Sequence, residues 1–344
     1  MKLSLFYLLA FFGLVSCGSK TTPVEASAGT GDVFYASGFK IYEFDSTYSL
    51  TIGNDRFDFT KGEKSPKYFI SSTTQLQFIK ALNELDNIVG VFDAGYFKDS
   101  LLNKKISEGK IINCKHSSNP DWESLIKFPD ATVYGSSHFD MNKSMAKKLN
   151  IRLIQINEYE EVSPLAKAEW IKVFGLISGK VHLADSIFKT IEQKYLNVKA
   201  IVSDSVSAPK VMAGEYYDGI WTVPGARSYV ATLIKDAGGD YIVKESTKPV
   251  LMMDKEAFFS YLRKAHFWRK VSPENWQIQK ITKDEINSTF GVYPEKLKSI
   301  IYCDLSKVNY FESSLLNPDI ELKDMINSIH SVDSLKFYKI IPVE

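Results

Sequence analysis

The chain has 344 residues, of which 44% are hydrophobic, and its 42 Lys and Arg residues nearly balance its 41 Asp and Glu residues. This composition is typical of a globular protein with enough chain for two domains and a sizeable core. A net charge of +1 provides no long-range positive field to attract phosphates, which argues against DNA or RNA as a partner.

The first element is an apolar stretch over residues 3–15, preceded by Lys2. Its length is that of the apolar part of an export signal, and it is too short to cross a bilayer as a helix. It ends in Ser16 and Cys17, which resembles the bacterial lipobox, in which the cysteine becomes lipidated. We therefore predict a signal peptide over 1–16 and a lipid on Cys17. Ser, Thr, Gly and Ala dominate the residues that follow, which predicts a flexible tether over 17–31.

The next part of the chain has the pattern of a first α/β lobe, which we assign to residues 32–178. Apolar and polar residues alternate over 33–59, and this alternation predicts a β-hairpin. From there to residue 156, short apolar runs alternate with helical stretches, which predicts βαβ units around a parallel sheet. The predicted strands are 68–70, 88–92, 131–134 and 152–156, and the predicted helices are 73–83, 122–127 and 141–149.

A helical stripe follows. Apolar residues recur at spacings of three and four from Trp170 to Tyr195, as on one helix or on two helices that meet near Gly179. A single helix over 181–202 would be about 30 Å long and could join two lobes as a stiff strut. We assign this linking helix to residues 179–203.

Beyond the strut the alternation resumes, and it predicts a second α/β lobe over 204–344. The predicted strands are 210–214, 219–223, 241–243 and 299–302, and the predicted helices are 228–237, 255–265 and 318–330. The sequence therefore predicts an α/β fold of two lobes with central, mostly parallel sheets, joined by a long helix. We expect the largest cleft, and the ligand, between the lobes, where strand ends converge.

Cysteine and histidine usage bears on disulfides and metals. Cys114 and Cys303 remain after Cys17 and lie in different predicted lobes. Because a bridge between the lobes would restrict their opening, we expect two separate buried thiols. The five histidines show no spacing typical of a metal site, so we expect neither a metal nor another cofactor.

Five segments carry a family resemblance: WTVPGARSY at 221–229, DAGGDY at 236–241, SPLAKAEWIK at 163–172, FES at 311–313 and PDIELKD at 318–324. In this order they resemble the solute-binding proteins of ABC importers that have a helical strut and bind ferric siderophores, haem or vitamin B12. The resemblance covers nearly all of the chain from about residue 33. It implies a two-lobed receptor that captures one ligand and delivers it to a membrane permease. We expect it to be a monomer.

Aromatic residues near predicted strand ends are candidate ligand contacts, although each could instead belong to the core or to a solvated loop. Trp221 lies in a segment punctuated by Gly and Pro, where a turn can present its ring to a cleft, and Tyr216 lies just before it. His138 follows a Gly-Ser-Ser run, and Tyr159 is a weaker candidate. The resemblance adds Tyr96, which matches a ligand-contacting aromatic residue of the vitamin B12 binders.

The resemblance also concerns docking to the permease. In the vitamin B12 binders a Glu on each lobe is expected to pair with permease arginines, and by register these positions fall on Gln75 and Arg227. Neither residue is acidic, so we expect docking to use other carboxylates. Arg227 could reach an acidic group of the ligand, dock onto an acidic partner, or remain a solvated surface residue.

Other functional classes find less support. The sequence has no G-x-S-x-G, H-E-x-x-H, P-loop or dinucleotide motif, and Ser144 and Lys147 fit an S-x-x-K pattern without its partner motifs. We therefore expect not an enzyme but an exported lipoprotein on a bacterial membrane, facing the periplasm, that captures an iron siderophore, haem or a corrinoid. The alternative is a surface lipoprotein that scavenges a ligand or binds a protein without a permease. The ligand stays open, because anionic siderophores suit Arg and Tyr whereas corrinoids suit aromatic platforms.

Overall fold

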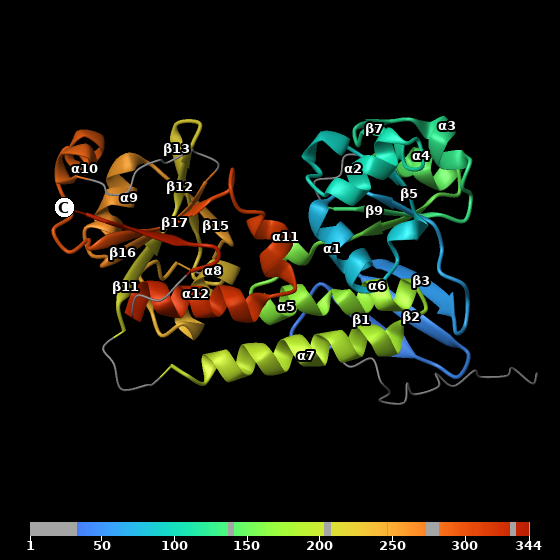
Figure 1. Ribbon diagram of the computed structural model, residues 1–344, viewed down its shortest axis with the longest axis horizontal. Helices are drawn as coiled ribbons and strands as arrows, with labels where there is room; N and C mark the ends of the chain where they lie inside the picture. The colour runs from blue at the N-terminus through green and yellow to red at the C-terminus, as the bar shows by residue number, and fades with distance from the viewer. Residues whose placement is uncertain are drawn as a thin grey trace, which may run out of the picture.

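The computed structural model describes residues 33–136, 141–202, 208–245, 247–272, 282–330 and 335–343. The predicted signal peptide, the tether with Cys17, and His138 lie outside the described residues. Figure 1 shows two α/β parts side by side above a base of helices, with the carboxyl-terminal part on the left.

The first part begins with a small antiparallel sheet of three strands, β1 (Phe39–Glu43), β2 (Thr47–Ile52) and β3 (Asp55–Thr60). The sequence predicts a two-stranded hairpin here, whereas the structure has a third strand. Ile52 pairs with Asp55, so Gly53 and Asn54 form a two-residue turn, and Gly53 has the positive φ of 57° that such turns require. The phenyl ring of Phe39 packs against Trp170 at 5.0 Å, which fixes the sheet to the helical base.

The main sheet of this part has the order β10-β9-β4-β5-β6, and all of its strands are parallel. Its strands are β4 (Tyr68–Ile70), β5 (Ile88–Val91), β6 (Ile112–Asn113), β9 (Thr132–Gly135) and β10 (Arg152–Gln155). Its helices are α1 (Thr73–Ala81), α2 (Ser100–Ser107), α3 (Trp122–Ile126) and α4 (Lys143–Lys148), and a short hairpin pairs β7 (Lys115–His116) with β8 (Asn119–Pro120). The predicted βαβ arrangement is confirmed, while α2 and β6 to β8 are additions that the sequence pattern does not predict.

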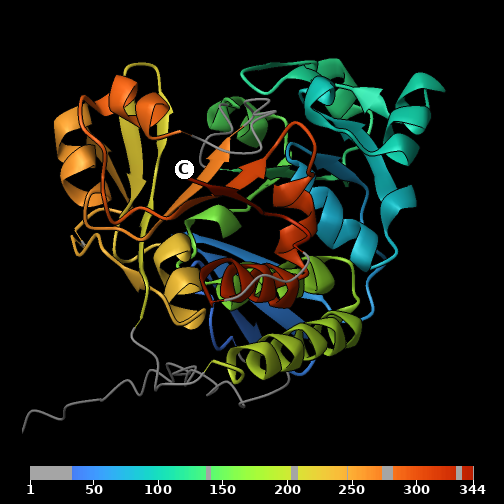
Figure 2. The same cartoon turned by 60° about the vertical axis from the view of Figure 1, so that its left-hand side comes forward.

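Three helices form the base: α5 (Pro164–Glu169), α6 (Ile171–Ile177) and α7 (Val181–Lys199). The helix α7 runs beneath both parts and packs against α5, α6 and α12 (Figures 1 and 2). Gly175 allows α6 to approach α7, because an added Cβ would lie 2.3 Å from the Cβ of Ala184.

The second part is built on the sheet β14-β11-β16-β17-β18, in which β18 alone runs antiparallel to its neighbour. Its strands are β11 (Lys210–Ala213), β14 (Asp240–Tyr241), β16 (Phe267–Ser272), β17 (Ser299–Asp304) and β18 (Lys339–Pro342). A separate antiparallel sheet joins β12 (Glu215–Tyr217), β13 (Ile220–Pro224) and β15 (Val250–Met253). The helices are α8 (Tyr229–Asp236), α9 (Lys255–Leu262), α10 (Lys283–Phe290), α11 (Tyr310–Leu315) and α12 (Pro318–His330).

The two thiols lie in different cores. Cys303 belongs to a hydrophobic core that extends from Phe39 to Ile341 and so includes both parts of the molecule, whereas Cys114 belongs to a smaller cluster with Phe69 and Phe92. Both thiols are free and buried, as predicted. Burial raises the pKa of each thiol to about 12, so neither is a nucleophile near neutral pH.

Candidate functional site

A cavity of about 430 Å³ lies between the two main sheets, and both contribute to its wall. The first part provides Ser72 and Thr74, which follow β4, and Glu158 and Tyr159, which follow β10. The base provides Pro164 and Lys167, and the second part provides Tyr229, Val230, Arg269, Val271, Tyr310, Phe311, Ser314 and Leu315. The carboxyl ends of parallel strands are the usual place for ligands in α/β proteins.

This cavity is not the largest one, so the expectation that the largest cleft lies between the lobes is wrong. A cavity of about 670 Å³ lies at the opposite edge of the first sheet. The helix α11 packs against α1 of the first part, and this contact brings the two walls together. We nevertheless take the smaller cavity as the candidate site, because it holds the buried ionisable side chains described next.

On the first wall, Glu158 is held by the start of α1. Ser72 caps this helix by accepting a hydrogen bond from the Thr74 amide at 3.1 Å, which fixes the Thr74 side chain. The Thr74 hydroxyl donates to Glu158 at 2.6 Å. Burial raises the pKa of the Glu158 carboxyl above its usual value, although this hydrogen bond acts in the opposite direction.

On the second wall, a cluster of tyrosines surrounds a buried ion pair. The Arg269 guanidinium lies 3.9 Å from Glu321, which is fully buried, and donates to the hydroxyls of Tyr310 at 2.8 Å and Tyr338 at 2.9 Å. Tyr229, Tyr310 and Tyr338 all donate to the Glu321 carboxylate. Burial acts to lower the pKa of Arg269, but Tyr338, Tyr310 and Glu321 outweigh it and raise that pKa well above its usual value. Arg269 is therefore a fixed, permanent positive charge at this wall.

Lys167 projects from α5 between the two walls. Its ammonium lies 4.2 Å from the ring centroid of Tyr229, in the geometry of a cation–π contact. Among the described residues, Lys167 has no ion pair or side-chain hydrogen bond. Burial lowers its pKa, while Glu321 and Glu158 act to raise it. A half-buried ammonium with free hydrogen-bonding capacity can bind an oxygen-rich ligand.

The residues predicted from the sequence to contact the ligand lie in several different places. Among those that the structure describes, Tyr159 lines this cavity. Trp221 belongs to strand β13, which agrees with the predicted strand 219–223 and not with a turn that presents the ring to a cleft. It is 5% exposed and stacks on Phe258 with 3.9 Å between the ring centroids. Tyr216 and Trp221 line a different cavity, of about 460 Å³, within the second part. Tyr96 is 78% exposed and lines none of these cavities. The ligand contacts of these residues remain predictions.

The two positions expected at a permease interface differ from each other. Arg227 is exposed just before α8, where Ser228 caps the helix by accepting from the Ala231 amide. Gln75 is 1% exposed, because its side chain accepts from the Ser71 amide at 2.8 Å and donates to the Gly135 carbonyl at 3.3 Å. Gln75 thus ties α1 to β9 and presents no surface to a partner.

Most residues of this site are not predicted from the sequence, above all Arg269, Glu321, Lys167 and Glu158. Arg269 lies on β16, a strand that the pattern does not predict because Arg269 and Lys270 interrupt its apolar run. The two side chains are nevertheless buried. The sequence does contain one indication of this strand. Two adjacent cations between Trp268 and Val271, in a segment rich in aromatic residues, can mark a strand whose charged side chains have buried partners.

Within the described residues, no cluster of His, Cys, Asp and Glu side chains has the arrangement of a metal site. No described helix is both long and apolar enough to span a bilayer.

Comparison with known proteins gives the family. The profile of the family described as periplasmic binding protein matches residues 70–286. An uncharacterized lipoprotein of Methanocaldococcus jannaschii is 27% identical over 278 residues, which cover 77% of this chain and 65% of that protein's length. The chain therefore spans slightly less than two thirds of that relative.

Two solved structures illustrate the fold. A periplasmic haem-binding protein from Pseudomonas aeruginosa has a TM-score of 0.55 at 13% identity and covers 80% of this chain and 98% of its own. An ABC-type Fe3+-hydroxamate transport protein from Saccharomonospora viridis has a TM-score of 0.57 at 13% identity and covers 81% of this chain and 97% of its own. The chain belongs to the periplasmic binding protein family, and this family supports a solute-binding role.

Proposed function

We propose that this protein is the solute-binding lipoprotein of an ABC importer and that it captures an iron-siderophore, haem or cobalamin-type ligand between its two sheets. The bound ligand is delivered to a permease. Cys17 carries the lipid that anchors the chain to a bacterial membrane on its periplasmic side. The proposal rests on the family, on the similar haem and Fe3+-hydroxamate proteins, and on a relative that is named a lipoprotein.

The ligand is assigned to this cavity because of Lys167. Lys167 extends between the walls with an ammonium that has no carboxylate or hydroxyl partner among the described residues, beside the fixed charge of Arg269. Carboxylates, hydroxamates and the side-chain acids of tetrapyrroles offer oxygen atoms to such groups. Tyr159 and Phe311 add aromatic surface for the body of the ligand.

The test is calorimetric titration of the protein with haemin, a ferric hydroxamate and cobalamin. We expect one of these to bind at one site per chain without turnover. The substitution Lys167→Met should weaken that binding by about 1.5–3 kcal/mol, the contribution of a hydrogen bond to a charged group. Lys235→Met, on the exposed side of α8, is the matched control and should leave the affinity unchanged.

Two results would overturn the proposal. Binding that Lys167→Met leaves intact would move the ligand away from this cavity. Failure of all three ligands, together with uptake of none in cells that carry the gene, would favour the alternative of a surface lipoprotein that acts without a permease.

A further inference from the structure

A second cavity that borders the first sheet lies away from the proposed ligand site. It has a volume of about 670 Å³ and is lined by residues at the amino ends of three parallel strands. Lys67 directly precedes β4, Asp130 lies two residues before β9, and Arg152 is the first residue of β10. The cavity between the main sheets lies at the carboxyl ends of two of these strands, β4 and β10, so the two sites are on opposite edges of the sheet.

Two segments border this cavity. The connection from β3 to β4 contributes Glu63 and Lys64, and it is held against the end of α6 by close contact with Gly179. Gly179 has a φ of +69°, and an added Cβ would lie 3.1 Å from the Glu63 carbonyl oxygen. Leu176 and Ile177 of α6 and the ring of Phe59 supply an apolar floor.

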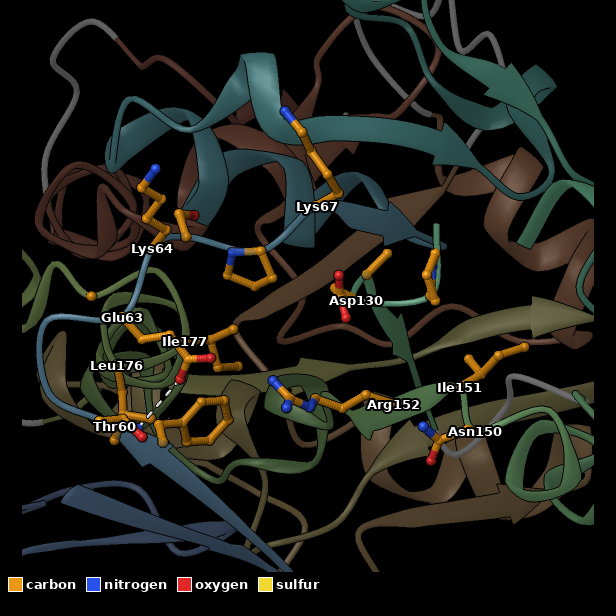
Figure 3. A pocket seen from close by; sticks show the side chains of 16 residues that line it. Thr60, Glu63, Lys64, Lys67, Asp130, Asn150, Ile151, Arg152, Leu176 and Ile177 are labelled. Carbon is orange, nitrogen blue, oxygen red and sulfur yellow. Dashed lines mark hydrogen bonds between the residues drawn. The ribbon is translucent and has the colours of Figure 1, made fainter. Parts of the chain in front are cut away.

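Two opposite charges extend into this space without meeting each other. The Arg152 guanidinium lies 5.4 Å from the ring centroid of Phe59 and has no carboxylate partner among the described residues. The Asp130 carboxylate likewise has no ion pair or hydrogen bond within the described part of the chain. Arg152 pairs with Thr132 across the strands, two residues beyond Asp130, so backbone register places both charges at one edge (Figure 3).

The polar groups around this pair differ in their availability. Lys67 donates to Asn87 at 2.9 Å, and Glu63 accepts from the Thr60 amide at 3.4 Å, so both have protein partners. Lys64 and the Asn150 side chain have none among the described residues, and both line the cavity (Figure 3). A ligand would thus meet two cations without a carboxylate partner, Arg152 and Lys64, together with the free carboxylate of Asp130 and the free amide of Asn150, above an apolar floor.

We infer that this cavity is a second binding site, which takes a short peptide with free termini. The peptide carboxylate binds Arg152, whose planar fork matches a carboxylate, and the peptide ammonium binds Asp130. Asn150 is suited to hydrogen bonding with the peptide backbone, and the floor accepts an aliphatic side chain. A volume of about 670 Å³ falls within the range of about 300–1,000 Å³ for small-molecule pockets and is generous for a single amino acid.

The test uses the tripeptide Ala-Leu-Ala and two blocked forms of it, one acetylated at the amine and one amidated at the carboxylate. Calorimetry should show one saturable site for the free tripeptide, and each block should weaken binding by about tenfold or more. Asp130→Asn should abolish the preference for the free amine, and Arg152→Gln the preference for the free carboxylate. Both side chains are exposed, so neither variant should disturb folding.

Two control variants show whether the tripeptide binds at this cavity. Arg56→Gln, on the exposed face of β3, should leave peptide binding unchanged. Lys167→Met should also leave it unchanged, which distinguishes this inference from the proposed function. The inference is wrong if the free tripeptide shows no saturable binding, if the blocked forms bind equally well, or if inorganic phosphate competes while Asp130→Asn has no effect.

Discussion

Glu169, on α5, holds the beginning of the described chain to the helical base. It is fully buried and accepts hydrogen bonds from the amides of Phe34, Tyr35 and Ala36 at 2.8–3.0 Å. Lys172 completes the site with an ion pair at 2.9 Å. Glu161 binds the next residues in the same way, since it accepts from the amides of Ser37 and Gly38. Two buried carboxylates thus satisfy five backbone donors that no secondary structure uses.

We predict that Glu169→Gln lowers the free energy of unfolding by about 3–5 kcal/mol, because the amide directs a donor at other donors and removes the carboxylate from the buried ion pair with Lys172. Chemical denaturation measures this. The control Asp86→Asn removes one partner of an exposed ion pair with Lys105 and should change stability very little. Equal stability of Glu169→Gln and the wild type would mean that the segment 34–38 contributes little to the fold.

Glu158 gives a prediction for pH. Burial raises the pKa of the Glu158 carboxyl in the folded protein above its value in the unfolded chain. The stabilisation by the protonated carboxyl is therefore complete below the pKa that Glu158 has in the unfolded chain, and it is lost as the pH rises through the pKa in the folded protein. Glu158→Gln keeps an acceptor for Thr74 and carries no charge. Its melting temperature relative to the wild type should therefore increase from about pH 4 to about pH 8. A constant difference in melting temperature across this range would show that ionisation of Glu158 does not destabilise the folded protein.

Among the elements, α7 determines how the two parts can move. It has 19 residues, which at about 1.5 Å per residue gives a rod of nearly 30 Å that packs on α5, α6 and α12. Because a continuous helix bends less easily than extended crossover strands, we predict closure of small amplitude. Solution scattering of the free and ligand-bound protein should give nearly equal radii of gyration. A decrease of several ångströms would contradict the role of α7 as a strut.

The elements also show what local pattern can and cannot predict. Strand β4 and helix α12 have the bounds that the sequence predicts, because an apolar run and a helical period mark them. Strand β16 escapes prediction because its central Arg269 and Lys270 look like a solvated segment, and their burial depends on partners far along the chain. The Arg269 guanidinium donates hydrogen bonds to Tyr310 and Tyr338, which are 41 and 69 residues away in the sequence. No local pattern contains that information.

In the molecule as a whole, two α/β parts share one hydrophobic core through the helical base. The predicted two-sheet fold is confirmed, but most residues of the candidate site are not predicted, since strand ends and loops from distant segments meet only in the folded chain. The aromatic residues chosen from the sequence show the difficulty. Trp221 has the sequence context of a pocket residue but stacks within the core of the second part, whereas Tyr159, the weaker choice, lines the cavity.

The proposed function requires that one iron chelate or tetrapyrrole binds between the two sheets. Diffraction data from crystals grown with haemin, a ferric hydroxamate or cobalamin, whichever binds in solution, collected at the absorption edge of iron or cobalt, would locate the metal of the ligand. We predict one anomalous peak per chain in the cavity bounded by Thr74, Lys167 and Phe311. A metal peak at any other place on the chain, with that cavity empty, would contradict the proposed function.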